Sequence, residues 1–65
     1  MREELLYEEY TEDKKHKFMI FQHDNAFDLW IQDFDEDWQD YYDRCDGRHL
    51  IDSFENAKKL GKQLI

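Results

Sequence analysis

The sequence of 65 residues lacks proline and contains only two glycines and one cysteine. A single cysteine cannot form an internal disulfide, which predicts a protein of a reducing compartment such as the cytoplasm. No apolar run approaches the roughly 20 residues of a membrane span, and the acidic N-terminus is unlike a signal peptide. Without a stretch of glycine or serine to form a linker, residues 1–65 are expected to form a single small domain.

Basic residues are also scarce. Nine Lys and Arg stand against 17 Asp and Glu, so the formal net charge is -8 and the pI about 4.6. Direct binding of DNA, RNA or an anionic membrane needs clustered Lys and Arg and is therefore not expected. A basic partner is favoured instead. The chain is expected to fold, because 17% of its residues are aromatic and disordered chains are poor in aromatics.

Two apolar segments predict a β-hairpin over residues 18–33. Phe18 to Gln22 is a short continuous apolar run, which is typical of a central strand. Asp24 and Asn25 supply turn chemistry. Residues 27–33 then alternate, with Phe27, Leu29 and Ile31 on one face and Asp28, Trp30 and Gln32 on the other.

Residues 34–46 support two interpretations. As a helix, Phe34, Trp38, Tyr41 and Cys45 form one apolar stripe that would bury Trp38, Tyr41 and Cys45. As a strand, residues 38–43 have suitable β-propensity, and Asp46-Gly47 would form a hairpin turn into residues 48–52. Periodicity favours the helix and propensity the strand, and the helix is preferred narrowly.

The end of the chain predicts a short strand near 48–52 and a helix over 53–65. Asp52 or Ser53 would cap the helix, and Asp52 and Glu55 have the spacing of a capping box. A glycine inside the helix, Gly61, indicates close packing against a sheet. Residues 1–10 fit a short helix or a strand, and 11–17 a loop. The predicted class is α+β: a small antiparallel sheet packed against a C-terminal helix, with a candidate second helix at 34–46.

Catalysis, cofactors and metal ions are not expected. The two glycines cannot form a phosphate-binding loop, and so small a chain has little room for a catalytic pocket. Asp33, Asp35 and Asp37 copy the start of a calcium-binding EF-hand loop, but Trp38 and Arg44 stand where it needs Gly and Glu. Cys45 and His49 do not make up the four ligands of structural zinc.

The main functional signal is the concentration of acids. Residues 24–46 carry nine acids and one base, a net of -8, while the flanking segments carry -2 and +2. On a strand or a helix these acids would form ordered rows that could replace nucleic-acid phosphates in a basic groove. A solvated face that only keeps the protein soluble is the alternative. The candidate phosphate-mimicking residues are Asp28, Asp33, Asp35, Glu36, Asp37, Asp40, Asp43 and Asp46, and the candidate aromatic anchors are Trp30 and Tyr42.

In size, charge, lone cysteine and α+β pattern, the chain resembles the small acidic proteins with which phages and mobile elements inhibit host nucleic-acid machinery, such as DNA-mimic anti-CRISPR proteins. This resemblance implies a monomer or weak dimer in the bacterial cytoplasm, without a cofactor. It would block the DNA- or RNA-binding groove of a basic protein or complex, such as a Cas effector. The other interpretation is an interaction module, antitoxin-like or an accessory subunit, that binds through aromatic residues.

Overall fold

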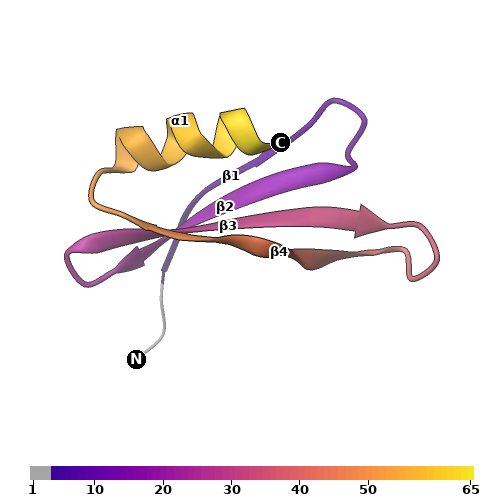
Figure 1. Cartoon of the computed structure of the whole chain (residues 1–65), viewed down its shortest axis with the longest axis horizontal. Coiled ribbons are helices and arrows are strands. Elements are labelled where there is room, and N and C mark those ends of the chain that lie inside the picture. The colour runs from indigo at the N-terminus through magenta and orange to yellow at the C-terminus, as the bar shows by residue number, and fades with distance from the viewer. Residues whose placement is uncertain (1–3) are drawn as a thin grey trace.

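The computed structural model describes residues 4–65, which form four strands followed by one helix. The strands are β1 (Glu4–Tyr10), β2 (His16–His23), β3 (Ala26–Asp35) and β4 (Asp40–Ile51), and the helix is α1 (Phe54–Leu64). The strands pair antiparallel in the order β1-β2-β3-β4. Figure 1 shows α1 lying along one face of the sheet, with the β1–β2 and β3–β4 turns at the same end. The α+β class predicted from the sequence is therefore confirmed.

The predicted hairpin over 18–33 is the centre of the sheet. Strands β2 and β3 pair without a shift from His16 opposite Asp33 to His23 opposite Ala26. Asp24 opens the two-residue turn in the left-handed conformation (φ 51°) that Asp tolerates. The predicted alternation is also observed, because Leu29 and Ile31 are buried on the face that α1 covers while Trp30 lies on the opposite face.

The candidate helix at 34–46 does not form. Strand β3 continues to Asp35, residues 36–39 turn, and β4 pairs back onto β3 from Asp40. The apolar stripe that suggested a helix is divided: Trp38 is 81% exposed and Cys45 is exposed, whereas Phe34 and Tyr41 are half-buried. Pairing with β3 satisfies the backbone of this segment, and its Tyr-rich sequence suits a strand. The β-propensity was the correct signal.

The predicted hairpin turn at Asp46-Gly47 is also wrong, since both residues lie inside β4. The pairing steps from Gln32 opposite Asp43 to Trp30 opposite Arg48, so residues 44–47 all face Ile31 as a large bulge. Asp46 takes a left-handed conformation there (φ 63°). The strand expected near 48–52 is the end of β4, which closes at Ile51.

The N-terminal segment is a strand rather than a helix. Strand β1 pairs with β2 from Glu4 opposite Gln22 to Tyr10 opposite Lys17, with an irregularity between Leu5 and Tyr7. Residues 1–3 of the expected segment lie outside the described residues. Within residues 4–65, the structure has no helix of the length and apolar character needed to cross a membrane.

Helix α1 closes the core. Ser53 is its N-cap: the Ser53 hydroxyl accepts a hydrogen bond from the Asn56 N–H at 3.3 Å, as one of the two predicted caps would. Five apolar residues are fully buried between helix and sheet: Phe18, Ile20, Leu29, Ile31 and Ala57. Gly61 lies directly on the Phe18 ring, where an added Cβ would come within 2.5 Å of a ring carbon. The close packing predicted from Gly61 is confirmed.

Gly61→Ala is expected to destabilise the protein, because the new methyl group must displace the buried Phe18 ring at a cost of about 1–3 kcal/mol. Helix propensity offsets about 1 kcal/mol of this cost, so the expected net loss is up to about 2 kcal/mol. Urea unfolding followed by circular dichroism measures the change. The control is Lys59→Ala at an exposed position of the same helix, which should change stability by less than about 0.5 kcal/mol. A stabilised Gly61→Ala variant would contradict the close contact.

Candidate functional site

The acids of the central segment lie on a hairpin formed by the end of β3, the turn and the first half of β4. We call residues 33–46 the acidic arm; it carries seven carboxylates and Arg44, a net charge of -6. Helix α1 carries one acid and three lysines, a net of +2. The molecule is therefore electrically polar, with the negative charge on the arm. Five arm carboxylates are exposed: Glu36, Asp37, Asp40, Asp43 and Asp46.

The tip of the arm is held by its own side chains. Asp35 Oδ1 accepts hydrogen bonds from the backbone N–H of Asp37 at 2.9 Å and of Trp38 at 3.4 Å. The Gln39 side-chain amide donates to the Glu36 carbonyl at 2.6 Å, and Gln39 is left-handed (φ 56°). These bonds fix the turn and leave the Trp38 ring 81% exposed at the end of the arm.

The arm retains like charges that oppose folding. Asp35 and Asp40 lie directly opposite each other as the last pair of β3 and β4 before the turn. Like charges in such a cross-strand pair are destabilising. Among residues 4–65, no ion pair reaches Asp37, Asp40, Asp43 or Asp46, and Lys15 Nζ lies 3.5 Å from Glu36. Asp43 accepts a hydrogen bond from the neutral Gln32 side-chain amide at 2.7 Å, so most of the negative charge on the exposed arm carboxylates is not balanced by a cation.

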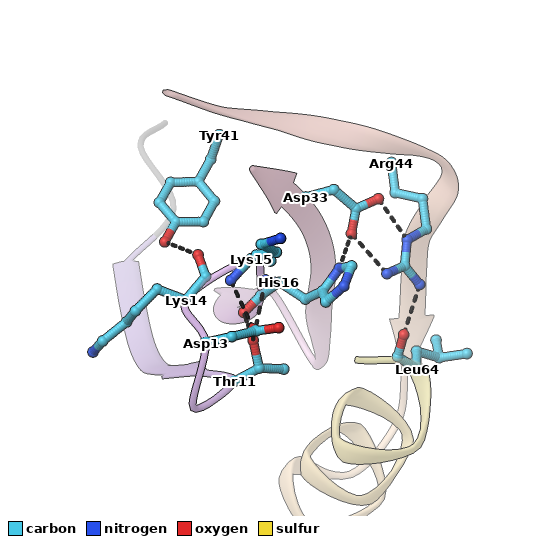
Figure 2. Close-up of polar contacts among 9 residues, drawn as sticks. All are labelled: Thr11, Asp13, Lys14, Lys15, His16, Asp33, Tyr41, Arg44 and Leu64. Carbon is cyan, nitrogen blue, oxygen red and sulfur yellow. Dashed lines mark hydrogen bonds and ion pairs between the residues drawn. The ribbon is translucent and has the colours of Figure 1, made fainter. Parts of the chain in front are cut away.

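The base of the arm is anchored to the β1–β2 loop. The Tyr41 hydroxyl donates to the Lys14 carbonyl at 2.7 Å, a contact drawn in Figure 2, and the Phe34 N–H donates to the Lys15 carbonyl at 2.7 Å. The Tyr41 ring packs edge-on against Phe34 at 5.2 Å and Tyr10 at 5.7 Å between ring centres. These contacts fix the arm relative to the sheet.

The bulge in β4 sends two arginines to opposite faces of the sheet. Residues four apart on a regular strand face the same side. Because residues 44–47 all lie opposite Ile31, three extra residues separate Arg44 from Arg48 and reverse this parity. Gly47 permits the bulge, since a Cβ there would lie 2.8 Å from the Arg44 carbonyl oxygen and 2.9 Å from that of Ile31.

On the face that α1 covers, Arg44 neutralises Asp33. The Arg44 guanidinium donates to both Asp33 oxygens, at 3.0 Å from Nε and 2.7 Å from Nη2, and His16 Nδ1 lies 2.7 Å from Asp33 Oδ1. Arg44 also donates to the Leu64 carbonyl at 2.7 Å, so it ties the arm to the end of α1 (Figure 2). The hydrogen bonds from Arg44 lower the pKa of Asp33 to about 2.

On the opposite face, Arg48 covers Asp28. Arg48 Nη2 lies 2.9 Å from Asp28 Oδ2 and Nε lies 2.9 Å from Oδ1, while the guanidinium stacks 5.0 Å from the Trp30 ring centre. Asp28 is completely buried beneath this contact. Its carboxylate is not accessible to a partner in this conformation.

The structure thus divides the residues predicted as phosphate mimics. Asp28 and Asp33 are held in ion pairs with arginine, and Asp35 is occupied by the turn. The row Asp33, Asp35, Asp37 is therefore not presented as a line of free carboxylates. The five exposed acids lie instead along the tip and the edge strand β4. Of the two candidate anchors, Tyr42 is 51% exposed and Trp30 lies half-buried beside Arg48.

Trp38 is a prominent exposed residue, although helical periodicity predicted that it would be buried. The sequence carried a signal for it, since Asp35, two intervening residues and Trp38-Gln39 fit a polar turn between two β-favouring segments. An exposed ring on a rigid turn is well suited to insert into an apolar pocket.

Two further searches, for a metal site and for similar proteins, bear on this surface. Within the part of the chain that the structure describes, no three His, Cys, Asp or Glu side chains are grouped so that they could hold a metal ion. Comparison of the chain with protein-family models, curated proteins and solved structures found no match.

The Asp33–Arg44 pair makes stability depend on pH at the acid end. The pKa of Asp33 falls from 3.8 to about 2 on folding, so its contribution is full above 3.8 and is lost as the pH falls through about 2. Asp33→Asn should therefore lower the free energy of unfolding by about 1–2 kcal/mol at neutral pH, and this difference should shrink as the pH falls from 3.8 to about 2 and disappear at lower pH. Urea unfolding across this pH range measures it.

Asp37→Asn, at the exposed turn, is the matched control for loss of one carboxylate. It should show a smaller difference from wild type over the same pH range. An Asp33→Asn difference that persists unchanged at pH 2 would contradict the role assigned to the ion pair.

Proposed function

We propose that the protein is a non-catalytic inhibitor whose acidic arm enters a basic, nucleic-acid-binding groove of another protein and takes the place of phosphates. The observation that carries the proposal is a set of exposed arm carboxylates that no ion pair reaches within residues 4–65: Asp37, Asp40, Asp43 and Asp46. The partner is a DNA- or RNA-binding protein or complex of a bacterial cell, for which a Cas effector is one example.

The electrostatic repulsion within the acidic arm supports a functional role. A net charge of -6 on fourteen residues repels itself, and the Asp35–Asp40 pair adds a direct unfavourable contact. A face needed only for solubility could spread these charges over the molecule. A concentrated negative patch on a fixed hairpin instead accelerates and orients association with a positively charged surface.

The shape of the arm also suits a groove. It is a two-stranded projection at one end of the sheet, and its base is fixed by Tyr41 and Phe34. Fixing the arm before binding reduces the conformational entropy that association must offset. Lys15 lies 3.5 Å from Glu36 at the tip, and within residues 4–65 no ion pair reaches the acids of β4.

Reversing two arm charges tests the proposal. Asp37→Lys with Asp40→Lys should weaken binding about a hundredfold, because lysines would face a basic groove, while removal of the Asp35–Asp40 repulsion preserves the fold. The assay is capture of binding proteins from bacterial lysate on the immobilised chain at low salt. Bound protein is then challenged separately with high salt and with duplex DNA. Both should release it.

The matched control changes the same charge elsewhere. Glu4→Lys with Glu55→Lys alters the net charge equally at two exposed positions outside the arm, and it should keep most of the binding. If the arm variant captures the same protein as the wild type, or if the two double variants lose binding equally, the arm is not the binding surface.

The second candidate function is an interaction module that binds chiefly through an aromatic anchor. The exposure of Trp38, at 81% on a fixed turn, specifically favours it. Such a partner would offer an apolar pocket, and an antitoxin-like or accessory subunit belongs to this class.

Trp38→Ala separates the two functions. For the aromatic module, binding should fall by at least about 2 kcal/mol and should survive high salt, because a buried ring is a typical hot spot. For the phosphate mimic, the loss should be smaller and binding should remain sensitive to salt. Tyr42→Ala, at the other exposed ring of the arm, is the comparison variant. Equal, small effects of both substitutions would remove the aromatic candidate.

A further inference from the structure

The face of the sheet that α1 leaves uncovered has an ordered composition. Cross-strand pairing sets three rows over its four strands. The first row is Leu5, Phe21, Asp28 and Leu50; the second is Glu8, Met19, Trp30 and Arg48; the third is Tyr10, Lys17, Gln32 and Asp43. We call these twelve residues the open face.

The open face exposes apolar side chains. Leu50 is 61% exposed, Leu5 is 47% exposed and Tyr10 is 37% exposed. Met19, Phe21 and Trp30 lie half-buried between them. Six of the twelve residues are aliphatic or aromatic, so the open face presents a group of neighbouring apolar side chains to the solvent.

The charges of the open face are nearly balanced and paired with one another. Glu8, Asp28 and Asp43 stand against Lys17 and Arg48, a net of -1 on a chain of -8. Lys17 Nζ lies 2.9 Å from Glu8, and Arg48 Nη2 lies 2.9 Å from Asp28. The open face is therefore a surface at which two copies could meet without placing one acidic arm against the other.

The small hydrophobic core indicates that covering the open face would stabilise the protein. Only five apolar side chains in the described chain are fully buried, all between the sheet and α1. A domain of this size buries roughly 60% of its unfolded surface and is marginally stable by itself, and association is a common remedy. Covering the open face would bury a second layer of apolar side chains.

We propose that a second copy of the chain covers the open face, so that two sheets pack face to face in a helix–sheet–sheet–helix dimer. Sheets packed in this way lie about 10 Å apart with interdigitating side chains. A two-fold axis brings the same rows of both copies together. Asp43 lies at the margin of the covered face, but the rest of each acidic arm, with Glu36, Asp37, Asp40 and Asp46, projects from the end of the sheet, so each dimer presents two arms.

The free edge formed by β4 is less suitable for association. The edge strand β4 carries Asp40, Asp43 and Asp46 and is distorted by the bulge at residues 44–47. Charges and bulges are the usual devices that prevent pairing at a sheet edge. Two such edges would also align acids of like sign.

Sedimentation equilibrium of the full chain tests the dimer. The mass should rise from 8.2 kDa towards twice that value as concentration increases about a hundredfold. Added salt should strengthen the dimer, because it screens the repulsion between two chains of net charge -8. The phosphate-mimic complex should weaken under the same change, so the two proposals can fail separately.

Leu50→Lys should weaken the dimer at least tenfold, because it places two buried ammonium groups in an apolar contact. Leu50 is exposed in the single chain, so this variant should fold, which circular dichroism checks. Trp38→Lys, which removes an exposed ring outside the open face, should leave the dimer unchanged. Dimerisation that survives Leu50→Lys or is lost with Trp38→Lys would overturn the proposed surface.

A fluorescence measurement avoids any substitution in the open face. In Trp38→Phe, Trp30 is the remaining tryptophan and it lies in the second row of the open face. Its emission should shift to shorter wavelength over the concentration range in which the mass doubles. A chain of 8.2 kDa at every concentration, or a doubled mass without the emission shift, would overturn the proposal.

Discussion

The arrangement of this protein depends on one irregularity, the bulge opposite Ile31. A regular β4 would place Arg44 and Arg48 on the same face. The bulge reverses the parity and gives two of the three aspartates of β3 a guanidinium each, Arg44 for Asp33 beneath the helix and Arg48 for Asp28 on the open face. Gly47 makes this possible, because backbone oxygens occupy the space a Cβ would need. Two carboxylates of a strongly acidic segment are thereby compensated where they are least exposed.

The same bulge separates structural acids from available ones. Asp28 and Asp33 support the sheet, and the low pKa of Asp33 reflects that use. Beyond the bulge, the acids of the tip and of β4 have no comparable partner within residues 4–65. Net charge alone does not distinguish the two groups. Arg44 also contacts the end of α1, so the acidic arm and the helix are positioned by one side chain.

The two faces of the sheet are specialised in different ways. One face is closed by α1, with Gly61 allowing the helix to lie on Phe18. The other face holds an apolar surface with internally paired charges, at which we place a second copy. The acidic arm extends from one end of the sheet, and Tyr41 anchors it to the β1–β2 loop. The proposed self-association and the proposed partner binding would use largely separate surfaces, with Asp43 common to both.

The sequence by itself determined the elements whose signals are local. The central hairpin was predicted correctly from the turn residues Asp24 and Asn25 and from the alternation between Phe27 and Ile31. Helix α1 was predicted correctly from its cap at Ser53. Each of these signals depends only on neighbouring residues. The sequence also located the negative charge. Tertiary structure alone decided the secondary structure of residues 34–46. Helical periodicity and β-propensity gave different predictions there, and pairing with β3 makes the segment a hairpin. It also decided which acids are free, since the partners of Asp28 and Asp33 lie 20 and 11 residues away in sequence and reach them only through the bulge. Long-range pairing of this kind leaves no local pattern, so the sequence could predict an acidic surface but not which carboxylates form it.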